Sequence, residues 1–498
     1  MADKPTSNPS PDLKRRQLLK LAGATAAIGG IGLGSGLVRA SEIPGAASAA
    51  TEQDDVLDVV IIGAGLAGLT AARDLQLAGS QSFLVLEARN RVGGRTLNYE
   101  VGDGYISEVG GQWIGPGQTA VEDLARQLEV GTFPQYYQGR TVMMGGNGRL
   151  EIDLEGTFGT DMAVADKLSE MSHDVPSGAP WKSPKAAELD KLSVGDWLAT
   201  QNIKPEEYSG WDAALTLTGG ASPAKMGLLH YLSMINSANK EYEKLDSVKD
   251  SAQGTRFVGG SQILSIKMAE QLGDKVRLQC PVRRISDWDR EVVTLHTDQG
   301  LVRARKVIVA IHPALCNQVQ FEPALPAARA ALQRAWPAHS PARKMAMVYP
   351  RPFWRDKGLN GHIFMVGGPI YWAWDNSPPN GEIGIINAFI SNANLPSDPT
   401  TAKHALTEIF ARAWGDEALH SVAYHDQDWG RDDPWTLTCV SAIPPGFWTT
   451  HGEALRPPCG NLIWSGTETA DIWAGYMDGA VRSGHQSALQ ALNALRRV

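Results

Sequence analysis

The sequence predicts an α/β fold that contains a discontinuous Rossmann-like domain, and three observations support this prediction. Residues 56–87 read as a strand, a glycine-rich turn, a helix and a second strand, which is how a doubly wound sheet begins. The same alternation returns at residues 257–310 and 461–498, and the segments between them differ in composition. A chain of 498 residues is also long enough for two or more domains.

The first turn carries a dinucleotide-binding fingerprint. An apolar strand ending at Ile62 leads into the run Gly63, Ala64, Gly65, Leu66, Ala67 and Gly68. Gly63 permits a tight turn, Gly65 lets the backbone approach a pyrophosphate, and Gly68 lets the following helix pack on the strand. The second strand ends at Glu87, 22 residues beyond Gly65, where a carboxylate can accept hydrogen bonds from a ribose. An ordinary glycine turn would not predict this acid, so we expect nucleotide binding.

A second glycine–arginine motif follows the acid and indicates which dinucleotide binds. It consists of Ala88, Arg89, Asn90, Arg91, Val92, Gly93, Gly94, Arg95 and Thr96. A nicotinamide dehydrogenase needs no such loop, whereas for a tightly held FAD the loop can supply backbone N–H groups and an arginine to the pyrophosphate. We therefore expect FAD. The alternative for Arg91 and Arg95 is a solvated surface loop.

The N-terminus reads as a targeting signal. A charged segment containing Arg15 and Arg16 precedes a Gly/Ala-rich apolar run over residues 21–38 and a small-residue cleavage site. We expect residues 1–40 to be a twin-arginine-type signal peptide and residues 41–55 to be a linker. The protein would then be periplasmic or exported, and would meet the membrane only through the export machinery. The alternative is an uncleaved anchor of about 18 residues.

Composition and charge narrow the partners. The net charge is −8, and it becomes −12 without residues 1–40, which hold six basic and two acidic residues. This acidity disfavours a nucleic-acid partner and is compatible with a cationic small molecule. The four cysteines are far apart and the histidines lack metal-ligand spacing, so we expect no metal site, and any disulfide pairing stays open. The histidines expected to be structural are His312, His425, His451 and His485.

The C-terminal block carries a resemblance to a known family. Its residues are Gly466, Thr467, Glu468, Thr469 and Ala470, followed by Trp473, Ala474, Gly475, Tyr476, Met477, Asp478, Gly479 and Ala480. Together with the two N-terminal motifs, the Gly-Gly-Gln-Trp segment 110–113 and the Pro-Phe-Trp segment 352–354, it resembles the flavin monoamine oxidase family over residues 56–495. The resemblance implies an amine oxidase/glutathione-reductase-like fold. In that fold a discontinuous FAD-binding domain packs against a substrate domain of mixed sheet and helices.

The same resemblance implies an activity and a domain arrangement. The chain would oxidise a primary or secondary amine by hydride transfer to flavin N5; the imine would hydrolyse to an aldehyde or ketone, and O2 would reoxidise the flavin and give H2O2. We expect the FAD-binding domain to comprise residues 56–135, 250–315 and 455–498. The substrate domain would comprise residues 136–249, which read as helix-rich, and residues 316–454.

Three residues are candidates for catalysis. Lys344 interrupts an apolar strand, where an unpaired ammonium is costly to bury. The family has a lysine here, near flavin N5, that holds a water, and the resemblance carries this role to Lys344. The alternative is an edge-strand lysine whose ammonium reaches solvent. Tyr476 precedes a helix whose N-terminus would stabilise negative charge on the flavin, and its ring would stand beside the flavin with Trp473 nearby. The alternative for Trp473 and Tyr476 is core packing.

The remaining candidate residues are grouped by role. Those expected to bind FAD are Gly63, Gly65, Leu66, Ala67, Gly68, Glu87, Ala88, Arg89, Gly94, Arg95, Thr96, Gly111, Gln112, Trp113, Val282, Gly466, Glu468, Tyr476 and Met477. Those expected to line the substrate pocket are Trp113, Cys439 and Tyr476.

Two departures from the family pattern bear on the cofactor and the substrate. In the mammalian members a cysteine tethers the flavin and an aromatic cage wall follows it. Here the segment before Pro444 places Thr438 at the tether and Cys439 at the wall, which implies noncovalent FAD, although a one-residue shift would bring Cys439 to the tether. In related L-amino-acid oxidases an arginine binds the substrate carboxylate where Trp113 stands here. This favours a primary or secondary amine without a carboxylate, with aromatic and alicyclic amines among the candidates.

Rival functions stay open at this point. They are an L-amino-acid oxidase, a polyamine oxidase, and an FAD-dependent C–C desaturase of the protoporphyrinogen oxidase or carotenoid desaturase type. A desaturase would share the FAD motifs without needing Lys344 or Tyr476. An FAD-binding protein without catalysis is a further class. A periplasmic electron carrier could take the place of O2, and a homodimer is compatible with the sequence.

Overall fold

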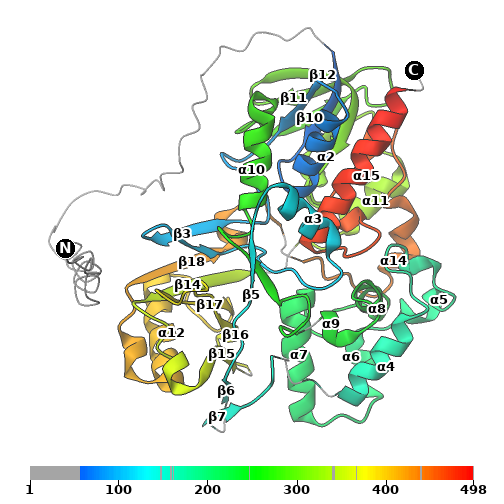
Figure 1. Ribbon diagram of the computed structural model, residues 1–498. Coiled ribbons are helices and arrows are strands. Elements are labelled where there is room, and N and C mark those ends of the chain that lie inside the picture. The colour runs from blue at the N-terminus through cyan, green and yellow to red at the C-terminus, as the bar shows by residue number, and fades with distance from the viewer. Residues whose placement is uncertain are drawn as a thin grey trace, which may run out of the picture.

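The computed structural model describes residues 56–145, 148–156, 160, 162–245, 247–338, 342–365, 367–437 and 440–496. The signal peptide and linker predicted for residues 1–55 lie outside the described residues. The described chain forms two large sheets and several groups of helices (Figure 1).

The first sheet has eight strands in the order β13-β10-β11-β12-β1-β2-β9, and β19 pairs with β12 beyond the end of β11. Its strands are β1 (Leu57–Ile62), β2 (Phe83–Leu86), β9 (Val276–Arg277), β10 (Val282–Ser286), β11 (Val293–Thr297), β12 (Gly300–Val309), β13 (Gln320–Glu322) and β19 (Leu462–Trp464). The strands β19, β12, β1, β2 and β9 run parallel. The last four residues of β1 and all of β2 are buried and apolar, as expected for parallel strands covered on both faces.

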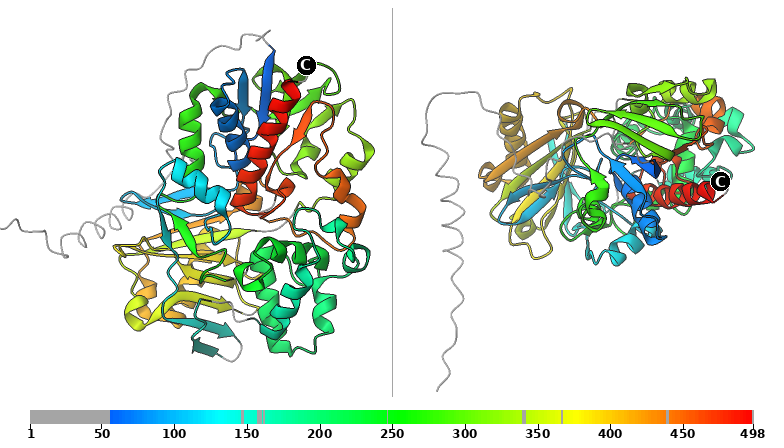
Figure 2. Two further views of the ribbon diagram at one scale, coloured as in Figure 1. Left: turned by 45° about the vertical axis from the view of Figure 1, so that its right-hand side comes forward. Right: turned by 90° about the horizontal axis from the view of Figure 1, so that it is seen from above.

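Four helices pack with this sheet: α2 (Leu66–Leu77), α3 (Thr119–Gln127), α10 (Ile263–Leu272) and α15 (Met477–Leu495). The helices α2 and α15, from opposite ends of the chain, lie side by side (Figure 2). A Cβ at Gly484 of α15 would lie 2.5 Å from the carbonyl oxygen of Ala67 in α2, so only glycine permits this approach. His485 of α15 also contacts Asp74 of α2 at 2.5 Å. The C-terminal block therefore completes the nucleotide-binding unit, and the predicted α/β fold is confirmed.

The second sheet has seven strands in the order β18-β14-β17-β16-β15-β6-β7. Its strands are β6 (Arg140–Gly145), β7 (Gly148–Ile152), β14 (Arg343–Tyr349), β15 (Leu359–Met365), β16 (Ile370–Asp375), β17 (Gly384–Ile390) and β18 (Ala423–Asp428). Among the described strands of this second sheet only β15 and β6 pair in parallel, so the sheet is mixed. The helix α12 (Pro399–Trp414) packs its apolar side chains against one face.

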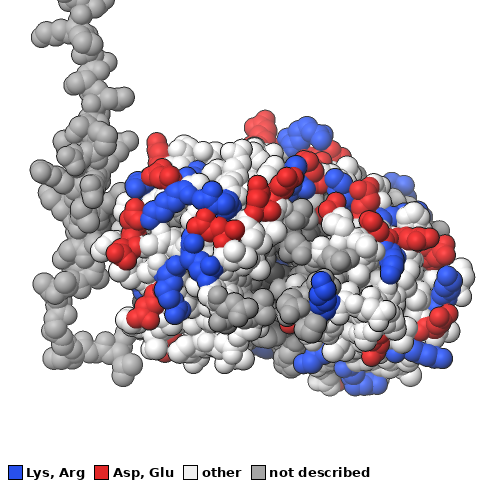
Figure 3. Space-filling view, turned by 90° about the horizontal axis from the view of Figure 1, so that it is seen from below, with Lys and Arg blue, Asp and Glu red and all other residues white. Residues whose placement is uncertain are grey.

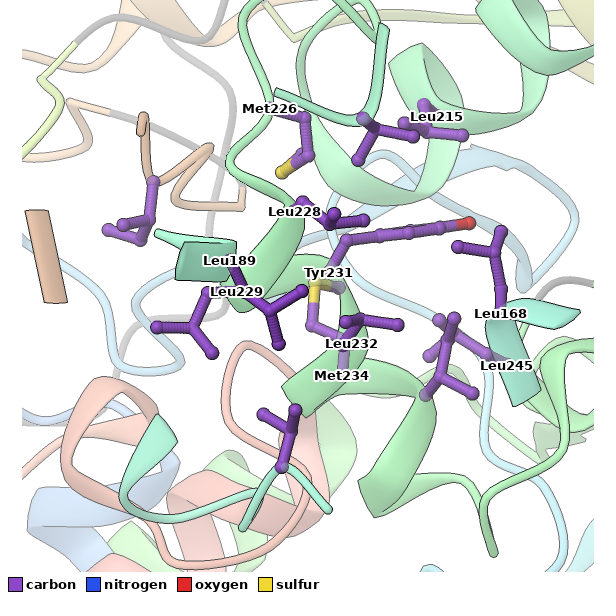
Figure 4. Packing of buried hydrophobic residues seen from close by; sticks show 14 of the residues in the cluster. Leu168, Leu189, Leu215, Met226, Leu228, Leu229, Tyr231, Leu232, Met234 and Leu245 are labelled. Carbon is purple, nitrogen blue, oxygen red and sulfur yellow. The ribbon is translucent and has the colours of Figure 1, made fainter. Parts of the chain in front are cut away.

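A helical layer completes the molecule, and its core is the largest apolar cluster (Figure 4). Its helices are α4 (Met162–Ser172), α5 (Ala186–Leu189), α6 (Val194–Ala199), α7 (Pro205–Gly219), α8 (Leu228–Ser237), α9 (Tyr242–Leu245), α11 (Ala327–Ala335) and α14 (Phe447–His451). Figure 4 shows Leu168, Leu215, Leu228 and Leu245, which come from four different helices, directed toward a common centre. The short helix α13 (Trp429–Asp432) follows β18.

Two small sheets join these parts: β3 (Asn98–Gly102) with β4 (Tyr105–Glu108), and β5 (Thr132–Pro134) with β8 (Thr255–Phe257). Two details differ from the expected domain segments. Residues 136–249 are helix-rich as expected, but their first part forms the β6–β7 hairpin. The strand β13 joins the first sheet although it lies past residue 315, and its sequence Gln-Phe-Glu gives no apolar signal. The domain boundaries themselves stay predictions.

The described surface is mixed in charge. On the face shown in Figure 3, basic and acidic side chains are interspersed rather than gathered by sign. Within the described ranges, none of the helices combines the length and the apolar composition needed to cross a membrane.

Candidate active site

A cavity of about 280 Å³ begins at the carboxyl ends of the parallel strands of the first sheet and extends to the second sheet. Ile62, Leu86 and Ala310, at or just beyond the ends of β1, β2 and β12, line one end. Trp372 and Phe389, from β16 and β17, line the other. The carboxyl edge of a parallel sheet is where open α/β folds place their ligands.

Most of the residues predicted to bind FAD line this one cavity. They are Gly63, Gly65, Leu66, Ala67, Glu87, Ala88, Arg89, Gly94, Arg95, Thr96, Gly111, Gln112, Trp113, Val282, Gly466, Glu468, Tyr476 and Met477. The exception is Gly68, which is covered: a Cβ there would lie 1.9 Å from the carbonyl oxygen of Gly63. Gly68 therefore serves the packing of α2 rather than contact with a ligand.

Gly63 and Gly65 in the first turn serve different purposes. Gly63 has φ +103°, and a Cβ there would meet the Ala310 carbonyl oxygen at 2.7 Å, so the protein's own backbone demands glycine. Gly65 has φ −79°, which any residue can adopt. A Cβ at Gly65 would meet only the Cα of Gly94, at 3.9 Å. The space that Gly65 leaves therefore opens into the cavity at the start of α2, where a pyrophosphate would find the helix N-terminus.

Glu87 is held in place beside this turn. Its Oε2 accepts a hydrogen bond from the Ala64 backbone N–H (2.8 Å), and its Oε1 accepts from the Arg89 backbone N–H (2.9 Å) and from Arg89 Nη1 (3.1 Å). A carboxylate has about four acceptor positions. One position therefore remains for a ribose hydroxyl at the cavity wall.

The arginine loop is not a solvated surface segment. Arg89 and Arg91 both pair with Asp433, at 2.9 and 3.0 Å. Burial, and then the charge of Arg89, lowers the pKa of Arg91. Arg91 also donates to the carbonyl oxygen of Gly94 (3.1 Å) and so shapes the loop, while Arg95 lines the cavity and pairs with Glu468 at 2.7 Å. The alternative of a solvated loop is wrong.

The N-terminus of α15 forms a second helix end at the cavity. Thr467, in a 3₁₀ turn (Thr467–Thr469), accepts from the Gly475 N–H at 2.8 Å and donates to the Tyr476 carbonyl at 2.7 Å, which fixes the entry into the helix. Tyr476 and Met477 line the cavity. Trp473 is placed differently: its indole is buried in the helical core and donates to the Gly117 carbonyl (3.1 Å). It lies behind Tyr476, with ring centroids 5.0 Å apart, so core packing describes it better than catalysis.

An aromatic wall closes the end of the cavity at the second sheet. Trp113 stacks on Trp372 with centroids 5.2 Å apart and lies 4.8 Å from Trp374. Trp372 lies directly opposite Phe389 in the sheet register, and both line the cavity. Sequence reasoning missed Trp372 and Phe389. The alternation of Trp372 and Trp374 along one strand was the available signal, because alternate residues share a face.

Lys344 lies in the interior of the second sheet, since β14 is flanked by β17 and β18. Its side chain is 1% exposed, so the alternative of an edge-strand lysine that reaches solvent is wrong. Its ammonium donates to the Gly110 carbonyl oxygen (3.0 Å) and to Gln112 Oε1 (2.5 Å). It also lies 5.3 Å from the centroid of Trp113. Lys344 therefore stands one side chain behind the cavity wall, in contact with two residues that form it.

Several other lining residues were not predicted, and one had been expected to be structural. His312 lines the cavity; burial lowers its pKa to about 4, with Glu468 opposing and Arg95 adding to the shift, so the ring is neutral. Its Nδ1 accepts from the Ala314 N–H, which leaves Nε2 to donate to Ser441 Oγ at 3.1 Å. The further unpredicted residues include Thr218, Ala252, Gln253, Leu437 and Val440. Nothing in their local sequence marks them, because they reach the cavity only through the fold.

Thr438 and Cys439, predicted to stand at the tether and at the cage wall, lie outside the described residues. Their described neighbours Leu437 and Val440 both line the cavity. Within the described residues no three or more His, Cys, Asp or Glu side chains gather as metal ligands do.

The cavity fits a dinucleotide in its chemistry. The N-termini of α2 and α15 border it, and Gly65 leaves space beside the first of them. The carboxylate of Glu87 stands where a ribose would lie, and arginines flank the loop that would hold phosphates. Glu468 Oε2 is buried and has no hydrogen-bond partner among the described residues, so it is free to accept from a ligand hydroxyl or N–H.

Comparisons with known proteins agree with this site. The chain matches the family model of flavin-containing amine oxidoreductases over residues 66–492. It is 36% identical over 450 residues to AofH of Mycobacterium tuberculosis, named as a flavin-containing monoamine oxidase, which covers 89% of this chain and 98% of that protein. Flavin-containing amine oxidase A of Sus scrofa is 30% identical over 471 residues, or 89% of this chain and 86% of that protein.

Solved structures give the same result. Cyclohexylamine oxidase from Brevibacterium oxydans superposes with a TM-score of 0.81 at 30% identity, covering 89% of this chain and all of that one. Putrescine oxidase bound to putrescine superposes with a TM-score of 0.80 at 30% identity, covering 88% of this chain and 99% of that one. The chain therefore belongs to the family of flavin-containing amine oxidoreductases.

Proposed function

We propose that this flavin-dependent amine oxidase acts on monoamines with an apolar body and no second charge. One observation carries the proposal. The carboxylates and guanidinium groups that line the cavity all come from the first-sheet side: Glu87, Arg89, Arg95, Arg283 and Glu468. Among the described residues, the second sheet and the helical layer contribute only uncharged side chains to the lining, such as Trp372, Phe389 and Thr218.

The uncharged end selects against charged substrates. A diamine would bring a second ammonium and an amino acid would bring a carboxylate, and an unpaired charge in such a place is costly. FAD held in this cavity would supply the acceptor for the hydride that leaves the carbon next to the amine nitrogen. The aromatic wall of Trp113, Trp372 and Phe389 holds the apolar body, and Tyr476 offers a ring face toward the amine. No described carboxylate stands at this end to take a proton, so the substrate enters as the neutral amine.

Matched substrates test this selectivity. We expect kcat/KM to be at least about 10²-fold higher for hexylamine than for 1,6-diaminohexane, and likewise higher for phenethylamine than for phenylalanine. The cost of the unpaired charge gives this difference, because each tenfold in the ratio corresponds to about 1.4 kcal/mol. Steady-state assays of H2O2 release measure both ratios. A diamine oxidised as efficiently as the monoamine of equal length would contradict the proposal.

A single substitution should shift the selectivity. Gln253 lines the cavity, and its Oε1 has no described hydrogen-bond partner. Gln253→Glu keeps the shape of the side chain and adds a carboxylate that can pair with a second ammonium. The kcat/KM for the diamine should therefore rise relative to that for the monoamine. Glu382→Gln, an exposed change, is the control and should leave the ratio as it is.

We also propose that FAD is held without a covalent bond. Thr438, at the expected tether, has no thiol, and the polar lining and helix ends can hold the dinucleotide by themselves. Acid precipitation should leave the yellow colour in the supernatant. Colour that stays in the pellet would contradict this. If it then moved to the supernatant in Cys439→Ser, Cys439 would be the tether.

We propose export through the twin-arginine pathway as well. The paired Arg15 and Arg16 ahead of an apolar run support it, and an enzyme that binds FAD before export would have to cross the membrane folded. Replacing both arginines with lysine should hold the full-length chain in the cytoplasmic fraction. If the unmodified chain and the lysine variant were distributed in the same way between the cell fractions, export by this pathway would be refuted.

A further inference from the structure

A buried series of hydrogen bonds connects Lys344 with Glu108. Lys344 Nζ donates to Gln112 Oε1 at 2.5 Å, and Gln112 Nε2 donates to Asn376 Oδ1 at 2.8 Å. Asn376 Nδ2 then donates to Glu108 Oε2 at 3.0 Å. Each of the four residues is at most 1% exposed. The series spans the contact between the β3–β4 sheet and the second sheet, and Gln112 brings it to the cavity wall.

The direction of the series is set at its two ends. An ammonium can only donate and a carboxylate can only accept, so both amides must turn their oxygen toward Lys344 and their nitrogen toward Glu108. Hydrogen bonds that point the same way polarise one another, and the effect is stronger where water is excluded. A neutral Lys344 could still donate to Gln112, but the hydrogen bond would lose its charge assistance and become weaker. The charge on Lys344 therefore strengthens the hydrogen bond that orients Gln112 at the cavity wall.

Glu108 is ionised at the far end. Burial alone would favour the neutral acid, but the charge and hydrogen bond of Arg256, the hydrogen bond of Asn376 and the charge of Lys344 outweigh it, and the pKa of Glu108 is lowered. Arg256 pairs with Glu108 Oε2 at 2.8 Å. Glu108 Oε1 has no described hydrogen-bond partner and is also fully buried.

Other charged groups around Lys344 are engaged elsewhere. Arg343, the preceding residue of β14, pairs with Asp426 of β18 at 2.8 Å. The residues opposite Lys344 in the neighbouring strands are Phe389 and Gln427, which carry no charge. Arg95, which lines a void of about 10 Å³ together with Lys344, pairs with Glu468. The charges of Glu108 and Lys344 do interact, since Lys344 is among the groups that lower the pKa of Glu108.

We propose that Glu108 is a positioning residue: its carboxylate keeps Lys344 protonated and, through Asn376, orients Gln112 at the wall of the cavity. This interaction lies inside the protein and does not depend on which amine is oxidised. Glu108 itself lies outside the cavity lining.

The test measures the charge of Lys344 directly. Lysine labelled with carbon-13 at Cε is incorporated into the holoenzyme, and the resonance that disappears in Lys344→Met is followed through a pH titration. In Glu108→Gln the titration midpoint should fall by about one pH unit or more, because an attractive charge has been removed. Glu382→Gln removes an exposed carboxylate and should leave the midpoint in place. In Glu108→Asp, which keeps the charge, the titration midpoint should lie close to that of the unmodified enzyme.

A second variant covers the case in which Glu108→Gln does not fold, since Arg256 would lose its buried partner. Asn376→Leu breaks the series without removing a charge, and the midpoint should again fall. An unchanged midpoint in either folded variant overturns the proposal. Because the readout needs no amine turnover, it separates failure of this inference from failure of the proposed function.

Discussion

Replacing Gly65 with Val should give a folded protein that holds no FAD. Gly65 has an ordinary backbone angle, and a Cβ there meets no protein atom closer than 3.9 Å, so the fold tolerates a side chain. The branched side chain would project into the cavity at the N-terminus of α2, where the pyrophosphate must approach the backbone. The flavin content of the purified variant, read from its visible spectrum, measures the loss.

Two controls separate cofactor loss from misfolding. Gly145→Val places the same side chain at an exposed position with open space, so flavin content should be unchanged. Gly63→Val clashes with the Ala310 carbonyl oxygen and requires φ +103°, so this variant should fail to fold. Full flavin occupancy in Gly65→Val would mean that the cavity does not hold the dinucleotide at this turn.

Replacing Lys344 with Met should leave FAD bound and slow the reaction of the reduced enzyme with O2 by on the order of 10²-fold. Reduction of O2 builds up negative charge, and a buried ammonium stabilises that charge more strongly than an exposed one because water does not screen it. Methionine keeps the length of the side chain among the rings of Trp113, Trp374 and Phe389. Stopped-flow mixing of reduced enzyme with oxygenated buffer measures the rate.

Reduction of the enzyme by the amine, measured in the same variant, serves as the internal control for reoxidation by O2. Reduction by the amine should change much less than reoxidation, since Lys344 lies behind the cavity wall rather than in it. Lys267→Met, on the outer helix α10, is the control for loss of a lysine. Equal reoxidation rates in Lys344→Met and the unmodified enzyme would show that Lys344 does not act on the oxygen reaction.

The local part of the site could be predicted from the sequence. Gly63 is required locally by its positive φ and Gly68 by its close approach to Gly63, so the pattern of strand, turn and helix predicts both. Glu87 follows at the end of the next strand for the same reason. The C-terminal block could be recognised too, because Thr467, Gly475 and Tyr476 form one compact turn into a helix.

The rest of the site depends on contacts between distant segments. Trp113, Trp372 and Phe389 form one wall although they come from a loop and two strands of different parts of the chain. A lysine in an apolar strand suggests either an edge or a buried partner, and only the strand order decides that Lys344 is interior. For a related reason the sequence did not show that His312 lines the cavity or that the Trp473 indole packs in the helical core. Sequence does not show which side of a residue faces a cavity and which faces the core.

Anaerobic mixing of the purified holoenzyme with a monoamine is the most direct test of the central claim, that this cavity oxidises amines with a bound flavin. Hexylamine or phenethylamine should bleach the yellow absorbance in a single turnover, and the rate should rise with pH as the neutral amine becomes the main form. A flavin that chemical reductants bleach but that no amine reduces at any pH would contradict the account.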